Sequence, residues 1–80
     1  MAPKLKQLSG NDVVGILKGF GFSMHRQKGS HVKLRRVAHG VKETLVVPNH
    51  DPISKGTLKA IFNQASAYIP RNDLQQHFFN

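Results

Sequence analysis

The spacing of the apolar residues changes twice along the chain, and this change constrains the fold more than any other feature. From Gly10 to Phe20 apolar residues recur three and four positions apart, which predicts an amphipathic helix. From Phe22 to Pro48 they alternate with polar residues, which predicts β-strands. After Ser54 the helical spacing returns. This order predicts an α+β sandwich of two layers, with helices covering one face of a sheet.

Capping signals mark both ends of the first helix. Ser9 and Asp12 have the spacing of a capping box, in which each side chain accepts a hydrogen bond from the backbone N–H of the other. Gly21 is placed to end the helix in the left-handed conformation. We therefore expect this helix at about 10–20.

Turn residues at 28–30 and around 38–40 divide the alternating segment into three strands. We expect these strands at 22–27, 31–37 and 41–47. They form an antiparallel meander, because such short turns leave no room for crossover helices.

The middle strand of this meander has one apolar and one basic face. Val32 and Leu34 alternate with His31, Lys33 and Arg35, and successive strand residues point to opposite faces. The basic face is the candidate binding surface.

Two helices complete the expected fold. Ser54 can cap the first of them, and Pro70 ends it. Its apolar stripe consists of Leu58, Ile61, Phe62, Ala65 and Tyr68 or Ile69. Asn72 can cap a short last helix from Asp73 to about Phe79, whose Leu74, His77 and Phe78 fold back on the domain. We expect a single domain over 1–80, with its core at about 6–69 and a helical tail at about 70–80.

Charge narrows the class of partner. The chain has 12 Lys and Arg against 4 Asp and Glu, a net charge of +8, and no acid lies between Asp12 and Glu43. A regional excess of positive charge favours polyanionic partners.

The chain has no cysteine, which excludes a disulfide framework and cysteine-ligated zinc. No apolar run approaches the roughly 20 residues of a membrane helix. We therefore expect a soluble, cytoplasmic protein without a membrane partner.

Several short segments resemble those of one family in their order and spacing. They are Leu8-Ser9-Gly10, Arg26-Gln27-Lys28-Gly29-Ser30-His31, Val47-Pro48-Asn49-His50, Gly56-Thr57-Leu58-Lys59-Ala60-Ile61 and Asn63-Gln64-Ala65. Together, over about 6–65, they resemble the HicA toxin family. The resemblance implies a fold like the double-stranded-RNA-binding domain and a ribonuclease that cleaves mRNA and inhibits translation. It also implies a HicB-type antitoxin as partner, and His31 as the catalytic histidine. The hairpin at 36–42 departs from the family, being longer and more basic than the short polar turn that the resemblance implies, which bears on base preference and antitoxin fit.

RNA carries its own nucleophile, the 2′-hydroxyl. Cleavage then needs a base for that proton, an acid for the leaving 5′-oxygen and positive charge near the phosphate. His31 can serve as the base near neutral pH, although an ordinary exposed strand histidine is the alternative. Gly29 serves the turn, or permits close approach of a phosphate. We assign Ser30 to the turn, because adjacent strand residues point to opposite faces.

The general acid stays open among Lys28, His25 and His50. A three-residue turn places Gln27 opposite His31, with His25 on the same face, whereas we expect Arg26 opposite His31 for a two-residue turn. A metal site built from the three histidines at 25, 31 and 50 has little support without cysteines or a nearby acid. We therefore expect metal-independent chemistry and no cofactor.

Lys55 and Lys59 lie in the first turns of the second helix, where the helix dipole disfavours cations. They indicate a phosphate contact, or else an exposed, solvated pair. The candidate RNA-binding residues are Arg26, Lys28, Gly29, Ser30, Lys33, Arg35, Lys55 and Lys59. Two other functions remain open: a non-catalytic RNA-binding module of the same fold, and a protein-binding partner whose basic face meets an acidic surface.

Overall fold

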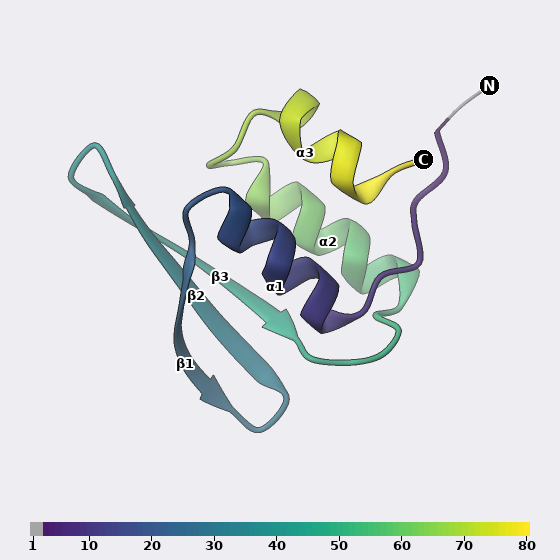
Figure 1. Ribbon diagram of the computed structural model, residues 1–80, viewed down its shortest axis with the longest axis horizontal. Helices are drawn as coiled ribbons and strands as arrows, with labels where there is room; N and C mark the ends of the chain where they lie inside the picture. The colour runs from purple at the N-terminus through teal and green to yellow at the C-terminus, as the bar shows by residue number, and fades with distance from the viewer. Residues whose placement is uncertain (1–2) are drawn as a thin grey trace.

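The computed structural model describes residues 3–80 and has the expected order of elements. These are α1 (Gly10–Gly19), β1 (Ser23–Lys28), β2 (His31–Ala38), β3 (Val41–Pro48), α2 (Lys55–Ala65) and α3 (Arg71–Phe78). The strands form one antiparallel sheet in the order β1-β2-β3, and the helices gather on one side of it (Figure 1). The expected α+β fold is confirmed. The expected domain covers 1–80, and its residues 1 and 2 lie outside the described residues.

Both capping signals of α1 are confirmed. The Ser9 hydroxyl accepts the Asp12 N–H at 3.1 Å, and the Asp12 carboxylate accepts the Ser9 N–H at 3.0 Å. The N–H donated by Ser9 holds the pKa of Asp12 below its usual value. Gly21 has a φ of +96°.

Gly10 brings the start of α1 directly against the end of β3. A Cβ at this position would lie 2.5 Å from the Cα of Asn49 and 2.7 Å from the carbonyl oxygen of Pro48. The Gly10 N–H donates to the carbonyl of His50 at 2.7 Å. The missing side chain therefore lets α1 fix the loop that follows the sheet.

The helices cover β2 and β3 but not β1. Val32, Leu34, Leu45 and Val47 are buried on the helical side of the sheet, which confirms the expected apolar face. Every side chain of β1 is exposed. The buried side chains form one cluster, which consists of Val13, Val14, Leu17, Phe22, Val32, Leu34, Leu45, Val47, Ile53, Leu58, Ile61, Phe62, Ala65, Ile69, Leu74 and Phe78.

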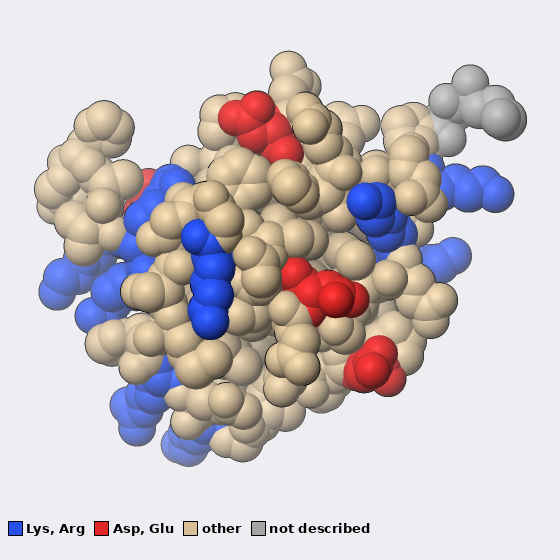
Figure 2. Space-filling model, viewed as in Figure 1, with Lys and Arg blue, Asp and Glu red and all other residues tan. Residues whose placement is uncertain are grey.

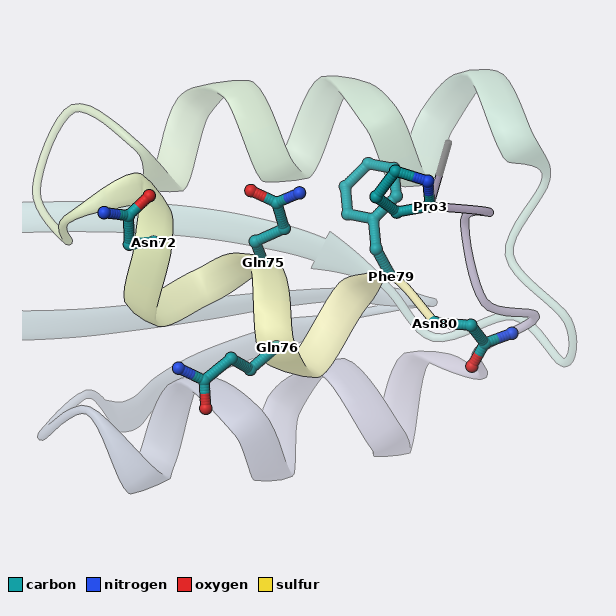
Figure 3. Close-up of a pocket in the computed structure, with 6 residues that line it drawn as sticks. All are labelled: Pro3, Asn72, Gln75, Gln76, Phe79 and Asn80. Carbon is teal, nitrogen blue, oxygen red and sulfur yellow. The ribbon is translucent and has the colours of Figure 1, made fainter. Parts of the chain in front are cut away.

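The last helix contributes directly to this cluster. Leu74 and Phe78 are fully buried, and the ring of Phe78 meets that of Phe62 at a centroid distance of 5.4 Å. His77 is exposed, and its ring packs roughly perpendicular to that of Phe20 at a centroid distance of 5.5 Å. Figure 3 shows α3 lying between α1 and α2.

The cap expected for α3 is wrong. The helix begins at Arg71, two residues before the expected start, with Pro70 at the N-cap and no side-chain cap. Proline fits there because the first backbone N–H groups of a helix have no partner within it, so its missing N–H costs no helical hydrogen bond. Asn72 lies inside the first turn instead.

Arg36 holds the sheet to the ends of two helical segments. Its guanidinium forms an ion pair with Glu43 at 2.6 Å. It also donates to the carbonyl oxygens of Phe20 at 2.8 Å and Tyr68 at 3.0 Å, and it lies 4.8 Å from the ring centre of Phe22. The guanidinium of Arg36 is therefore held by contacts within the fold.

The turn between β2 and β3 is shorter than the sequence suggested. It consists of His39 and Gly40, with φ values of 52° and 76°, and Ala38 already pairs with Val41. Positive φ at both residues matches the twist of the flanking strands. The other residues of the segment at 36–42 belong to the two paired strands. The segment is therefore long because its strands are long, and its turn is short.

Candidate active site

A two-residue turn sets which side chains share a face with His31. Gly29 has a φ of +58°, and space is open where its Cβ would be. The carbonyl of Ser30 accepts the N–H of Asn49 at 2.6 Å. Both residues therefore form the turn, as expected, and Lys28 lies directly opposite His31.

Both expected partners of His31 are wrong. Arg26 pairs with Lys33, one step further along the same face, and Gln27 pairs with a buried residue of the opposite face. The turn starts only after Lys28, so a two-residue connection places Lys28, not Arg26, opposite His31.

These pairings gather four of the expected site residues around one shallow hollow of about 240 Å³. It lies on the sheet face that the helices leave open, and it is lined by Arg26, Lys28, His31, Lys33 and Val46. Val46 is the member that sequence reasoning missed. Its alternation with the buried Leu45 and Val47 was the signal that could have placed it on this face.

The charge around the hollow is of one sign. Asp12 is on α1, Asp51 is in the loop after β3, Asp73 is on α3, and Glu43 is paired with Arg36. No carboxylate of the described residues lies on the open sheet face. Figure 2 views the molecule from the helical side: several basic side chains project at the left and lower left, and most of the acidic groups lie on the viewed face, where some basic groups also lie.

His25 lies at an irregularity in β1, where the register shifts between Met24 and Arg26. The positive charge of Arg35 is the largest cause that lowers the pKa of this exposed histidine, followed by desolvation and by further cations that include Lys33. A lowered pKa favours the neutral form of the imidazole. His25 is therefore a poor proton donor near neutral pH.

Arg35 extends the basic face beyond the hollow. It is half-buried and pairs with Ser23 on one side and Thr44 on the other. Its Nε is buried and has no hydrogen-bond partner among residues 3–80. Lys42, which contributes to the field at His25, is a further cation that the expected site did not include.

The remaining site candidates lie elsewhere. His50 is exposed, and within residues 3–80 only its backbone is hydrogen-bonded, with its carbonyl accepting the N–H of Gly10. Lys55 lines a hollow beside Leu5 and Pro52, and Lys59 lines another. No three metal-ligating side chains of the described residues lie close enough together to hold a metal ion.

Another hollow lies on the helical side of the molecule (Figure 3). It is lined by Pro3, Asn72, Gln75, Gln76, Phe79 and Asn80. None of these side chains is charged or can act as a base, so this hollow offers no group for acid–base chemistry. The hollow around His31 is the candidate active site because it combines a histidine with three cations. No helix of the described residues is long and apolar enough to cross a membrane.

Comparison with known proteins supplies the family. A family model described as HicA toxin of bacterial toxin-antitoxin matches residues 10–67. No curated protein and no solved structure gives a significant match. The matched segment contains α1, the whole sheet and α2, including the turn before His31 and the cations that surround it. The chain therefore belongs to the HicA toxin family of bacterial toxin–antitoxin systems.

Proposed function

We propose that this toxin is an endoribonuclease that cleaves mRNA and so inhibits translation, with a HicB-type antitoxin holding it inactive. The observation that carries the proposal is the position of His31 in a hollow with Arg26, Lys28 and Lys33 and without a carboxylate. Toxins of this family are generally ribonucleases. A histidine among cations suits a reaction that moves a proton beside a phosphate.

His31 acts as the general base in this proposal. Its imidazole takes the proton of the 2′-hydroxyl, the 2′-oxygen attacks the adjacent phosphorus, and the bond to the 5′-oxygen breaks. Negative charge builds up on the phosphate oxygens during the attack. The cations of Lys28 and Lys33, which line the same hollow as His31, stabilise that charge.

Lys28 is the best placed of the three candidates for the general acid. It lies directly opposite His31 on the same face. The lowered pKa of His25 disfavours the protonated imidazole that a general acid needs. His50 does not line the hollow.

Phosphate contacts hold the RNA over this face. Arg26, Lys28, Lys33 and Arg35 present their charges on it, and Gly29 leaves open space at the turn where a phosphate can approach. The Ser30 hydroxyl lies at the same turn. Contacts of this kind position a nucleic acid without reading its sequence.

The chemistry of the products tests the proposal. Purified toxin is incubated with an end-labelled RNA, with and without a chelator, and the cut position is mapped. We expect a 2′,3′-cyclic phosphate and a 5′-hydroxyl, unchanged yield in chelator, and no cleavage of an otherwise identical RNA that has 2′-deoxyribose at the mapped position. Products with a 5′-phosphate and a magnesium requirement would contradict the mechanism. Binding without any cleavage would favour the non-catalytic RNA-binding module.

Lys55 and Lys59 are expected to contribute to RNA affinity, although the structure places them away from the hollow. Asn49 is bonded to the turn at Ser30, and six residues later the chain reaches the start of α2 at Lys55. An RNA backbone that crosses this end of the molecule can therefore meet both the turn and Lys55. Replacing both lysines with alanine should lower affinity for all sequences alike and reduce the salt slope by roughly one to two units.

A matched control removes two lysines elsewhere. Lys4 and Lys18 are exposed and line none of the hollows described above, so their double alanine variant should keep the slope of the unchanged toxin. Filter binding over a series of salt concentrations measures both variants. If the two double variants had equal salt slopes, Lys55 and Lys59 would not contact RNA, and the contact would be confined to the sheet face.

A further inference from the structure

β3 presents an open hydrogen-bonding edge. Ala38 and Val41 flank a two-residue turn and therefore form a hydrogen-bonded pair, and such pairs recur at every second residue of an antiparallel ladder. The residues between them, Lys42, Thr44 and Val46, direct their N–H and C=O groups away from β2. No loop, cap or turn hydrogen bond among residues 3–80 satisfies these groups.

The two edges of the sheet differ in how well they are protected against a further strand. β1 is interrupted at His25 by a register shift, and an irregularity of this kind discourages pairing with a further strand. β3 pairs with β2 without interruption over all eight residues. Two of its side chains, Val41 and Val46, are apolar and exposed, at 60% and 43%. β3 is thus the edge suited to receive a strand.

Charge indicates what that strand would be. Lys42 on β3 and Lys33 and Arg35 on β2 lie on the open face beside this edge. A second copy of the toxin would bring its own net charge of +8 to the contact, which opposes self-pairing. A toxin of a toxin–antitoxin family has an antitoxin as partner.

We propose that an extended, acidic segment of the antitoxin adds to the sheet as a fourth strand along β3. Its backbone pairs with Lys42, Thr44 and Val46, and its acidic side chains point to the open face. The proposal rests on family membership and not on the ribonuclease activity.

Such a strand would also obstruct the active site. Neighbouring strands lie about 4.8 Å apart, so side chains of the fourth strand on the open face would lie next to Val46. Val46 lines the hollow together with His31 and Lys33. An acidic side chain there would neutralise Lys33 and occupy the space that a phosphate needs.

Amide hydrogen exchange of the toxin, alone and in the complex purified after co-expression with its cognate antitoxin, tests the pairing directly. In the free toxin the N–H groups of Lys42, Thr44 and Val46 should exchange fast, and in the complex at least about tenfold more slowly. The N–H of Gln27, which points outward from β1, should not change. Unchanged exchange at β3, or protection at Gln27 instead, would overturn the proposal.

A pair of variants at Thr44 separates the backbone contribution from the side chain. Thr44→Pro removes an outward N–H, which an edge strand tolerates, whereas Thr44→Val keeps it. Thr44→Pro should weaken antitoxin binding at least about tenfold, through lost hydrogen bonds and steric exclusion of the new strand, and Thr44→Val should bind as before. Equal binding by the two variants would contradict strand addition.

Two further measurements keep the result unambiguous. Thermal unfolding shows whether Thr44→Pro is folded, and if it is not, the exchange measurement decides. Self-association of the free toxin through β3, seen by sedimentation, would assign the edge to a second copy instead. A toxin that gains protection at β3 but does not cleave RNA would refute the proposed ribonuclease and leave this proposal standing.

Discussion

Replacing His31 with alanine is expected to slow RNA cleavage by roughly 10²–10⁴-fold, the usual contribution of a positioned proton-transfer group. The variant should remain folded, because His31 is exposed and lies on the sheet face that the helices leave open. RNA affinity should change little, since the neighbouring cations supply most of it. Single-turnover cleavage of a labelled RNA, together with filter binding, separates the two effects.

Two control variants make this result specific to the imidazole at position 31. His39→Asn removes a histidine at the far end of β2, about 26 Å away along the strand, and asparagine tolerates the left-handed backbone found there. It should cleave at the normal rate. His31→Gln keeps a polar side chain that cannot exchange a proton, and it should be as slow as His31→Ala. Normal cleavage by either His31 variant would exclude His31 as the general base.

The sequence predicted the elements of the fold because their signals are local. The capping box at Ser9 and Asp12 and the left-handed Gly21 involve residues close together in the chain, and both are present. Alternation along β2 identified the buried face with Val32 and Leu34 correctly. At the third helix the expected N-cap, Asn72, was wrong, because the helix begins directly after Pro70, the residue that was expected only to end the preceding helix.

The arrangement of the site depended on properties that alternation does not specify. Period two assigns each residue to a face but not to a cross-strand partner, so the placement of Lys28 opposite His31 required the turn length, which the structure supplies. Counting charges also cannot separate cations that are free to bind RNA from those committed to the fold. Arg36 is of the second kind, because its partners Glu43, Phe20 and Tyr68 lie 7, 16 and 32 residues away along the chain.

Phe78→Ala is expected to lower the free energy of unfolding by about 3–5 kcal/mol, as for other large aromatic residues removed from a core. The ring is fully buried against Phe62, and the Phe78 carbonyl accepts the N–H of Lys6 at 2.8 Å, so α3 also anchors the N-terminal segment. A loss of this size is a large fraction of the stability of a small domain, and α3 then belongs to the cooperative unit. Urea unfolding followed by circular dichroism measures it.

The conservative variant and a neighbour on the same helix complete this test. Phe78→Leu should lose less than about 1.5 kcal/mol, which keeps the comparison measurable if the alanine variant does not fold. His77→Ala should unfold nearly as the unchanged protein does, because the side chain of His77 is exposed. If Phe78→Ala lost no more than His77→Ala, α3 would be an appendage that can detach without unfolding the sheet. The hollow around His31 would then depend only on α1, α2 and the three strands.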